Sequence, residues 1–103
     1  MHLLTHLEEW TKSKSKIFTA EGYAPFLSPM LGDEKKARYV EVDGNGLLAR
    51  ATLWEDGSLE LEALNEFSKT VIQASRIALT PAALDDNLNW WLSEIATYVS
   101  PEA

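Results

Sequence analysis

Among the residue types that perform acid–base or metal chemistry, this chain of 103 residues is rich only in carboxylates. It contains no cysteine, which excludes a disulfide framework and a thiolate site. Its two histidines, His2 and His6, are four residues apart and could share one metal ion, but no carboxylate or cysteine close in sequence supplies a third ligand. We therefore interpret them as residues of a fraying chain end and expect no metal.

The segment Asp43-Gly44-Asn45-Gly46 could begin a calcium loop or a phosphate-binding turn. The twelfth position of a calcium loop must be a bidentate glutamate, and Trp54 occupies it here. A phosphate-binding turn should lead into a helix, whereas a strand pattern follows. Because the sequence also lacks a serine elbow, a histidine triad and a P-loop, we expect no cofactor.

Carboxylate pairs are the remaining candidates for catalysis. They are Glu8/Glu9, Glu55/Asp56, Glu60/Glu62 and Asp85/Asp86. Two carboxylates can act as general acid and base where burial raises the pKa of one of them. These pairs flank turns or lie on the polar faces of predicted elements, where water surrounds them. A catalytic base also needs neighbouring groups that this sequence does not provide, so we predict that the protein is not an enzyme.

The net charge of −7 lies entirely in the second half of the chain. Residues 1–50 hold seven basic and seven acidic residues, whereas residues 51–103 hold two basic and nine acidic ones. An acidic half disfavours nucleic acid and anionic membranes as partners, and it attracts a basic protein by long-range steering. The alternative is that this charge serves solubility alone.

The N-terminus lacks the basic region, apolar stretch and cleavage site of a signal peptide. No apolar run approaches the 18 residues of a membrane span. Since the absence of cysteine also suits a reducing compartment, we expect a cytoplasmic protein without a membrane partner.

The segment 47–64, LLARATLWEDGSLELEAL, predicts a β-hairpin that positions several of the charged groups. Its side chains alternate with a period of two on both sides of Asp56-Gly57, a strong turn signal because glycine adopts positive φ freely. One predicted face is small and aliphatic. The other carries Arg50, Thr52, Trp54, Glu60 and Glu62. That set is unusual for a mere solvent face, and we expect the hairpin to form the middle of a sheet.

The rest of the chain predicts a single domain, residues 1–103, around this hairpin. Apolar spacing predicts helices over 2–18 and 81–99, and Thr80-Pro81 is a typical helix start. Alternation and turn residues predict strands over about 23–28, 37–42, 47–54, 58–64 and 70–79.

Two of these strands have particular features. Pro25 and Pro29 limit the first to a short edge strand. In the last, Val71, Ile77 and Leu79 share one face. Short connections require antiparallel neighbours, so we expect an α+β fold. It consists of a single antiparallel sheet of four to five strands in meander order, with the N-terminal and C-terminal helices packed on one face.

What remains is a surface for recognising another protein. Flat aromatic area and fixed negative charge mark its candidate residues, which are Trp54, Glu55, Asp56, Glu60, Glu62, Glu66, Asp86 and Trp90. Aromatic residues dominate the affinity of interfaces, and charges set association rate and register. Trp90 falls outside the apolar stripe of its helix, so it is either exposed to solvent or part of a binding surface. The alternatives are that Trp54 packs in the core under the first helix and that the glutamates merely solvate their strand.

The hairpin and its flanks resemble the TriTu-type immunity proteins of bacterial contact-dependent inhibition systems. The resemblance is carried by Arg50-x-Thr52-x-Trp54-x-x-Gly57, followed by acidic–aliphatic alternation. The run YVEVDGNG precedes this pattern, and a strand and a terminal helix follow it, so that the likeness covers residues 38–98.

The resemblance implies a small, acidic, non-catalytic protein that neutralises the C-terminal toxin domain of a cognate effector, often a basic nuclease acting on tRNA. It implies a monomer or a 1:1 heterodimer with the toxin, without direct contact to nucleic acid. A nuclease cleft is positive because it binds phosphate, so an acidic surface could occupy that cleft or cover a neighbouring site. The alternative function is an acidic secretion chaperone that holds an effector segment as a dimer.

Overall fold

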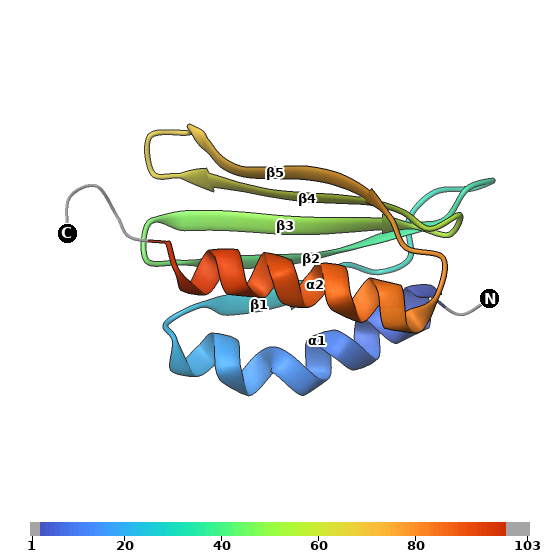
Figure 1. Ribbon diagram of the computed structural model, residues 1–103, viewed down its shortest axis with the longest axis horizontal. Coiled ribbons are helices and arrows are strands. Elements are labelled where there is room, and N and C mark those ends of the chain that lie inside the picture. Colours follow the sequence, from blue (N-terminus) through green and yellow to red (C-terminus); the bar gives the residue numbers. More distant parts are fainter. Residues whose placement is uncertain (1–2, 99–103) are drawn as a thin grey trace.

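Figure 1 shows the chain in a computed structural model, which describes residues 3–98. Helix α1 (Leu3–Ala20) leads into five strands, and helix α2 (Pro81–Ala96) follows the last of them. The strands are β1 (Ala24–Leu27), β2 (Ala37–Gly44), β3 (Leu47–Trp54), β4 (Ser58–Asn65) and β5 (Thr70–Ile77). They form one antiparallel sheet in the order β1-β2-β3-β4-β5, with β3 at its centre. The α+β meander predicted from the sequence is confirmed.

Tight turns set the register of the central strands. Asn45 and Gly46 both have positive φ, 51° and 75°, as a type I′ turn requires. This turn places Glu41 opposite Arg50. Gly57, with a φ of 94°, lies in the next turn, where a Cβ atom would come within 2.8 Å of the Ala78 carbonyl oxygen. Glycine is therefore required at position 57 for its backbone conformation and for its lack of a side chain.

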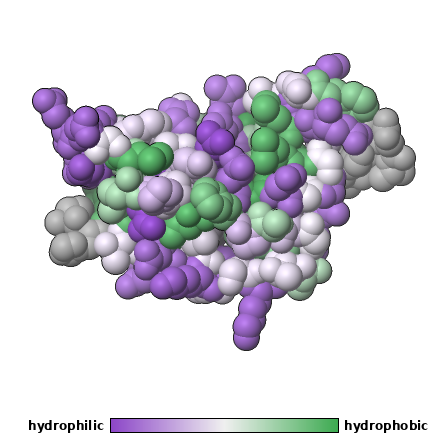
Figure 2. Space-filling view, turned by 180° about the vertical axis from the view of Figure 1, so that it is seen from behind, coloured by the Kyte–Doolittle hydropathy of each residue, from purple (hydrophilic) through white to green (hydrophobic). Residues whose placement is uncertain are grey.

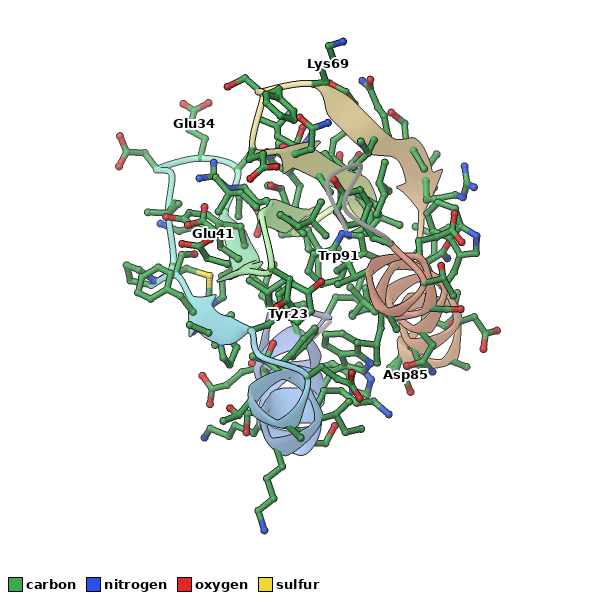
Figure 3. The ribbon with its side chains drawn as sticks, turned by 90° about the vertical axis from the view of Figure 1, so that its left-hand side faces the viewer. Tyr23, Glu34, Glu41, Lys69, Asp85 and Trp91 are labelled. Atoms are coloured by element: carbon green, nitrogen blue, oxygen red, sulfur yellow. The ribbon has the colours of Figure 1, made fainter. Side chains whose placement is uncertain are left out.

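Both helices lie on the same face of the sheet, and the opposite face is left open (Figure 1). Every second residue of β3 points into the covered layer, and Leu47, Ala49, Ala51 and Leu53 are at most 1% exposed. Trp91 of α2 is fully buried there, with its ring 6.3 Å from those of Trp10 and Phe18 of α1. Seen along the strands, Trp91 and Tyr23 lie between the sheet and the helices (Figure 3). Neither of the two described helices is long and apolar enough to cross a membrane.

The structure differs from the sequence-based expectations at β5. The strand ends at Ile77 rather than at residue 79, and the Ala78 amide donates to the Gly57 carbonyl oxygen at 2.8 Å. The face shared by Val71, Ile77 and Leu79 is not the buried one, because the register with β4 directs Ile72 and Ala74 into the core. Pairing across the sheet decides which face of a strand is covered.

The two helices also differ in detail from the prediction. Helix α1 continues to Ala20. Helix α2 ends at Ala96 with Thr97 as its C-cap, so the prediction that the helix includes residues 97 and 98 is wrong, and the predicted end at residue 99 lies outside the described residues. His6 is not at a frayed end, because its Nε2 atom lies 2.7 Å from Asp85 Oδ1 of α2. This contact joins the two helices across the layer. His2 lies outside the described part of the chain.

Candidate protein-binding surface

The face of the sheet away from the helices, here called the open face, carries alternate side chains of all five strands. They are Phe26, Tyr39, Glu41, Leu48, Arg50, Thr52, Trp54, Ser58, Glu60, Glu62, Leu64, Gln73, Ser75 and Ile77. Figure 2 views the molecule from this side and shows hydrophobic patches among hydrophilic groups. Phe26 is 52% exposed and Ile77 72% exposed. These two side chains lie on the opposite edge strands β1 and β5, so they belong to separate apolar patches of the open face.

Arg50 is the centre of the open face. Its guanidinium donates to Glu41 Oε2 on the neighbouring strand, from Nε at 3.0 Å and from Nη2 at 2.5 Å. The same group lies 4.4 Å from the centroid of the Tyr39 ring, a cation–π contact. The hydrogen bonds to Glu41 raise the pKa of Arg50 further above its ordinary value. The cation is thereby fixed in place, and its charge is offset within the protein.

The aromatic groups of β1 and β2 continue this cluster toward one edge of the sheet. The rings of Phe26 and Tyr39 are 6.1 Å apart and tilted by 49°. Phe26, Tyr39 and Arg50 therefore form a row across three strands, with Glu41 beside it. Figure 3 shows Glu41 on the other side of the sheet from Trp91. Packed rings and a held guanidinium lose little conformational entropy on binding, which favours recognition.

Trp54, the last residue of β3, belongs to the open face and is half-buried. Its Cα partner across the sheet is Ala37, a residue too small to cover the indole. Because α1 lies on the opposite face, the alternative that Trp54 packs under the first helix is wrong. Arg50, Thr52 and Trp54 of the predicted motif therefore share one face.

Glu60 and Glu62 lie beside each other along β4, on the open face. The Ser75 hydroxyl of β5 donates to Glu60 at 2.8 Å, and Glu62 is the cross-strand partner of Arg50. No cation of the described residues lies within 4 Å of either carboxylate. Neither carboxylate is therefore held in an ion pair by the described residues, although the charge of Glu62 contributes to the raised pKa of Arg50.

Two other predicted acids, Glu55 and Asp56, lie in the turn between β3 and β4. Glu55 Oε1 accepts from the Lys36 amide at 2.8 Å. Asp56 lies 2.7 Å from Lys35 Nζ and accepts from the Ser58 amide at 2.9 Å. The contact with Lys35 makes the largest contribution and the hydrogen bond from Ser58 adds to it, so that the pKa of Asp56 is lowered to about 2. Asp56 therefore offers less free charge than the sequence indicates, whereas the Glu55 carboxylate accepts from a backbone amide and is not paired with a cation by the described residues.

The remaining predicted residues lie elsewhere. Glu66 is in the turn between β4 and β5, at the opposite end of the sheet from Asp56. Asp86 and Trp90 belong to α2, in the other layer. The Arg76 guanidinium of β5 lies 5.3 Å from the Trp90 ring, which is 37% exposed. The eight residues therefore do not form one surface, and only Trp54, Glu60 and Glu62 occupy the open face together.

Cavities occur both on the open face and between the helices. A hollow of about 210 Å³ on the open face is lined by Arg50, Glu41, Glu62, Leu48 and Leu64. A larger apolar groove of about 330 Å³ runs between the C-terminal parts of α1 and α2. The structure describes no group of three or more possible metal ligands.

Tyr39, Glu41 and Phe26 also belong to the open face, although they are not among the residues predicted from the sequence. The signal for Glu41 was present in the turn, because a two-residue loop at Asn45-Gly46 places residues 41 and 50 opposite each other. The row from Phe26 to Arg50 had no comparable signal, since β1 is joined to β2 by a longer loop.

Comparison with known protein families agrees with the resemblance of the hairpin. The family described as "Immunity protein TriTu" matches residues 5–94, and these include every strand of the sheet and most of both helices. No curated protein sequence matches the chain. Because the match spans most of the chain, this protein belongs to the TriTu family of immunity proteins.

Proposed function

We propose that this protein binds and neutralises a cognate toxin domain through the open face of its sheet. The observation that carries the proposal is the composition of that face, which combines Trp54 and the Tyr39–Arg50 cluster with the free carboxylates of Glu60 and Glu62. The sheet is backed by a buried core, so that these groups are presented on a rigid support. Interfaces of this kind take affinity from buried aromatic anchors and rate from complementary charge.

The toxin in this proposal is a basic nuclease domain, delivered by contact-dependent inhibition. A nuclease cleft is lined with cations because neutralising phosphate dominates its affinity for nucleic acid. Glu60 and Glu62, two residues apart on one strand, would place their charges roughly 7 Å from each other along that cleft. Glu55 and Asp56 at one end of the sheet, and Glu66 at the other, would lie at the rim.

Asp86 and Trp90 enter this interface only where the toxin reaches around β5 onto α2. We infer that the protein acts in the cytoplasm without catalysis, as a monomer that forms a 1:1 complex. Inhibition requires only that the open face covers the entrance of the toxin cleft.

The proposal is tested by replacing Glu60 and Glu62 with lysine together. Binding of the purified cognate toxin domain is measured by surface plasmon resonance at low salt and at 0.5 M salt. We expect the association rate at low salt to fall at least tenfold, since steering by charge raises such rates by about 10 to 1,000-fold. High salt should remove most of the difference, because the Debye length is then only a few ångströms.

The matched control is Glu9→Lys with Glu21→Lys, two exposed residues of α1 and of the turn after it. It changes the net charge equally but on the helical layer. Equal losses for both double variants would mean that net charge alone steers the toxin. Unchanged affinity of the Glu60→Lys/Glu62→Lys protein would remove both carboxylates from the interface.

A further inference from the structure

The two edges of the sheet are built differently. Strand β1 has four residues, one of which is Pro25, and Pro29 follows soon after. Proline has no amide hydrogen, so this edge offers an incomplete ladder to another strand. Strand β5 has eight residues and no proline, and it forms the opposite border of the sheet (Figure 1). A long strand with free backbone groups at an edge is a template for pairing with another strand.

The free backbone groups of β5 can be assigned from its contacts. The Ala78 amide points toward β4, because it donates to Gly57. In an antiparallel ladder the amide and carbonyl of one residue point to the same side, and the side alternates along the strand. Ile77, Ser75 and Gln73 therefore direct their backbone groups away from the sheet. The Ser75 carbonyl oxygen accepts a long contact of 3.4 Å from the Arg76 guanidinium, which agrees with an outward carbonyl.

Exposed apolar side chains gather along this edge and at its two ends. The set comprises Phe67 (55% exposed), Val71 (40%), Ile77 (72%), Leu79 (58%) and Trp90 (37%). Trp90 lies on the helical side of the edge, against Arg76. An incoming strand would find main-chain partners along β5 and apolar contacts at its border, which are the two requirements of recognition by β-strand addition.

The charge around β5 favours a basic partner over a second copy of this chain as the occupant of this edge. The acidic residues Glu60 and Glu62 lie on β4 next to this edge, and Asp86 lies on α2, while the whole net charge of −7 belongs to residues 51–103. Pairing the β5 strands of two copies would bring two acidic segments 51–103 together, and their like charges would repel each other. A strand with basic residues would meet them favourably.

We propose that the toxin adds a strand of its own to the β5 edge, antiparallel or parallel, so that its body lies over the open face. This inference rests on the proposed function and specifies how the partner is held. The toxin strand alternates basic residues, which face Glu60 and Glu62, with apolar residues, which face Trp90. The bound sheet has six strands.

The test uses hydrogen exchange on the full chain, alone and with the purified cognate toxin domain. Strand addition should slow exchange at the Gln73, Ser75 and Ile77 amides at least tenfold, because each gains a main-chain partner. The inward amides of β5 are already bonded and serve as internal references. A complex that leaves the three outward amides unprotected overturns strand addition and leaves the proposed function standing, whereas absence of any complex overturns both.

A pair of variants gives an independent readout. Gln73→Pro removes an outward amide, and Gln73→Ala is the matched control that keeps it. We expect Gln73→Pro to weaken toxin binding at least tenfold relative to Gln73→Ala. Equal affinities overturn the inference. Protection of the three amides in the free protein that grows with its own concentration also overturns it, in favour of a second copy as the occupant.

Discussion

The two faces of the sheet are made by the same strands and have opposite chemistry. On the covered face β3 presents Ala49, Ala51 and Leu53, none of which is exposed to water. On the open face it presents Arg50, Thr52 and Trp54. Burial of apolar area holds the first face together, and each polar group there would need a partner. The second face can carry charge because water or a neighbouring residue satisfies each polar group there.

Adjacent tryptophans in α2 show the same division within one helix. Trp91 is fully buried, contacts Phe18 and Trp10, and donates from Nε1 to the Glu62 carbonyl at 3.3 Å. Trp90 points away, with Arg76 over its ring. Residues one position apart on a helix are rotated by about 100° and cannot share a face. The same residue type therefore has a structural role at position 91 and a surface role at position 90.

Among the changes that test this difference between buried and exposed residues, Trp91→Ala should have the largest effect, and that effect should be on stability. The change removes a buried indole from the layer between the helices and the sheet. We expect the free energy of unfolding to fall by about 3–5 kcal/mol, as for other large-to-small changes of core aromatics. Urea denaturation followed by circular dichroism measures it. A loss below about 1 kcal/mol would mean that the covered layer is not tightly packed.

Trp54→Ala tests the open face. Stability should fall by about 1–2 kcal/mol, less than for Trp91→Ala, because the side chain is half-buried and no helix covers it. Toxin affinity should fall by about 2 kcal/mol, roughly 30-fold, as for an aromatic anchor of an interface. Isothermal titration calorimetry gives the affinity and thermal melting gives the stability. The opposite pattern, a large loss of stability with normal binding, would make Trp54 a structural residue.

Trp90→Ala sharpens the comparison within α2. We expect it to weaken toxin binding by a few-fold and to cost about 0.5–1 kcal/mol of stability, the range of an exposed cation–π contact with Arg76. Trp91→Ala, by contrast, should affect stability first. A large drop in melting temperature of Trp90→Ala with normal binding would assign Trp90 to the structural layer.

The smallest expected effect concerns the ion pair at the rim. Since the pKa of Asp56 is lowered to about 2 from its ordinary 3.8, its carboxylate stabilises the fold at any pH above 4. That stabilisation is lost as the pH falls from about 4 to about 2. Titration of the Asp56 carboxyl carbon by NMR should give a midpoint near 2. Lys35→Gln should move the midpoint upward, and an unchanged midpoint would mean that the Ser58 amide holds the charge instead.

Much of the fold could be predicted because its signals are local. The hairpin around Asp56-Gly57 and the start of α2 at Thr80-Pro81 depend on residues within a few positions of each other. The Thr80 hydroxyl does accept from the Ala83 amide at 3.1 Å, as a helix cap should. Less of the candidate surface could be predicted, because residues such as Phe26 and Arg50 meet only through strands that are neighbours in space.

The sequence by itself determined which side chains share a face within each strand, and where the chain turns, because both follow from backbone geometry over a few residues. Only the tertiary structure decided which face the helices cover. It also decided that Lys35 and Arg50 form ion pairs with acids, while Glu60 and Glu62 form none with the described residues. The physical reason is that alternation is a local property, whereas burial and charge pairing depend on which distant elements pack together.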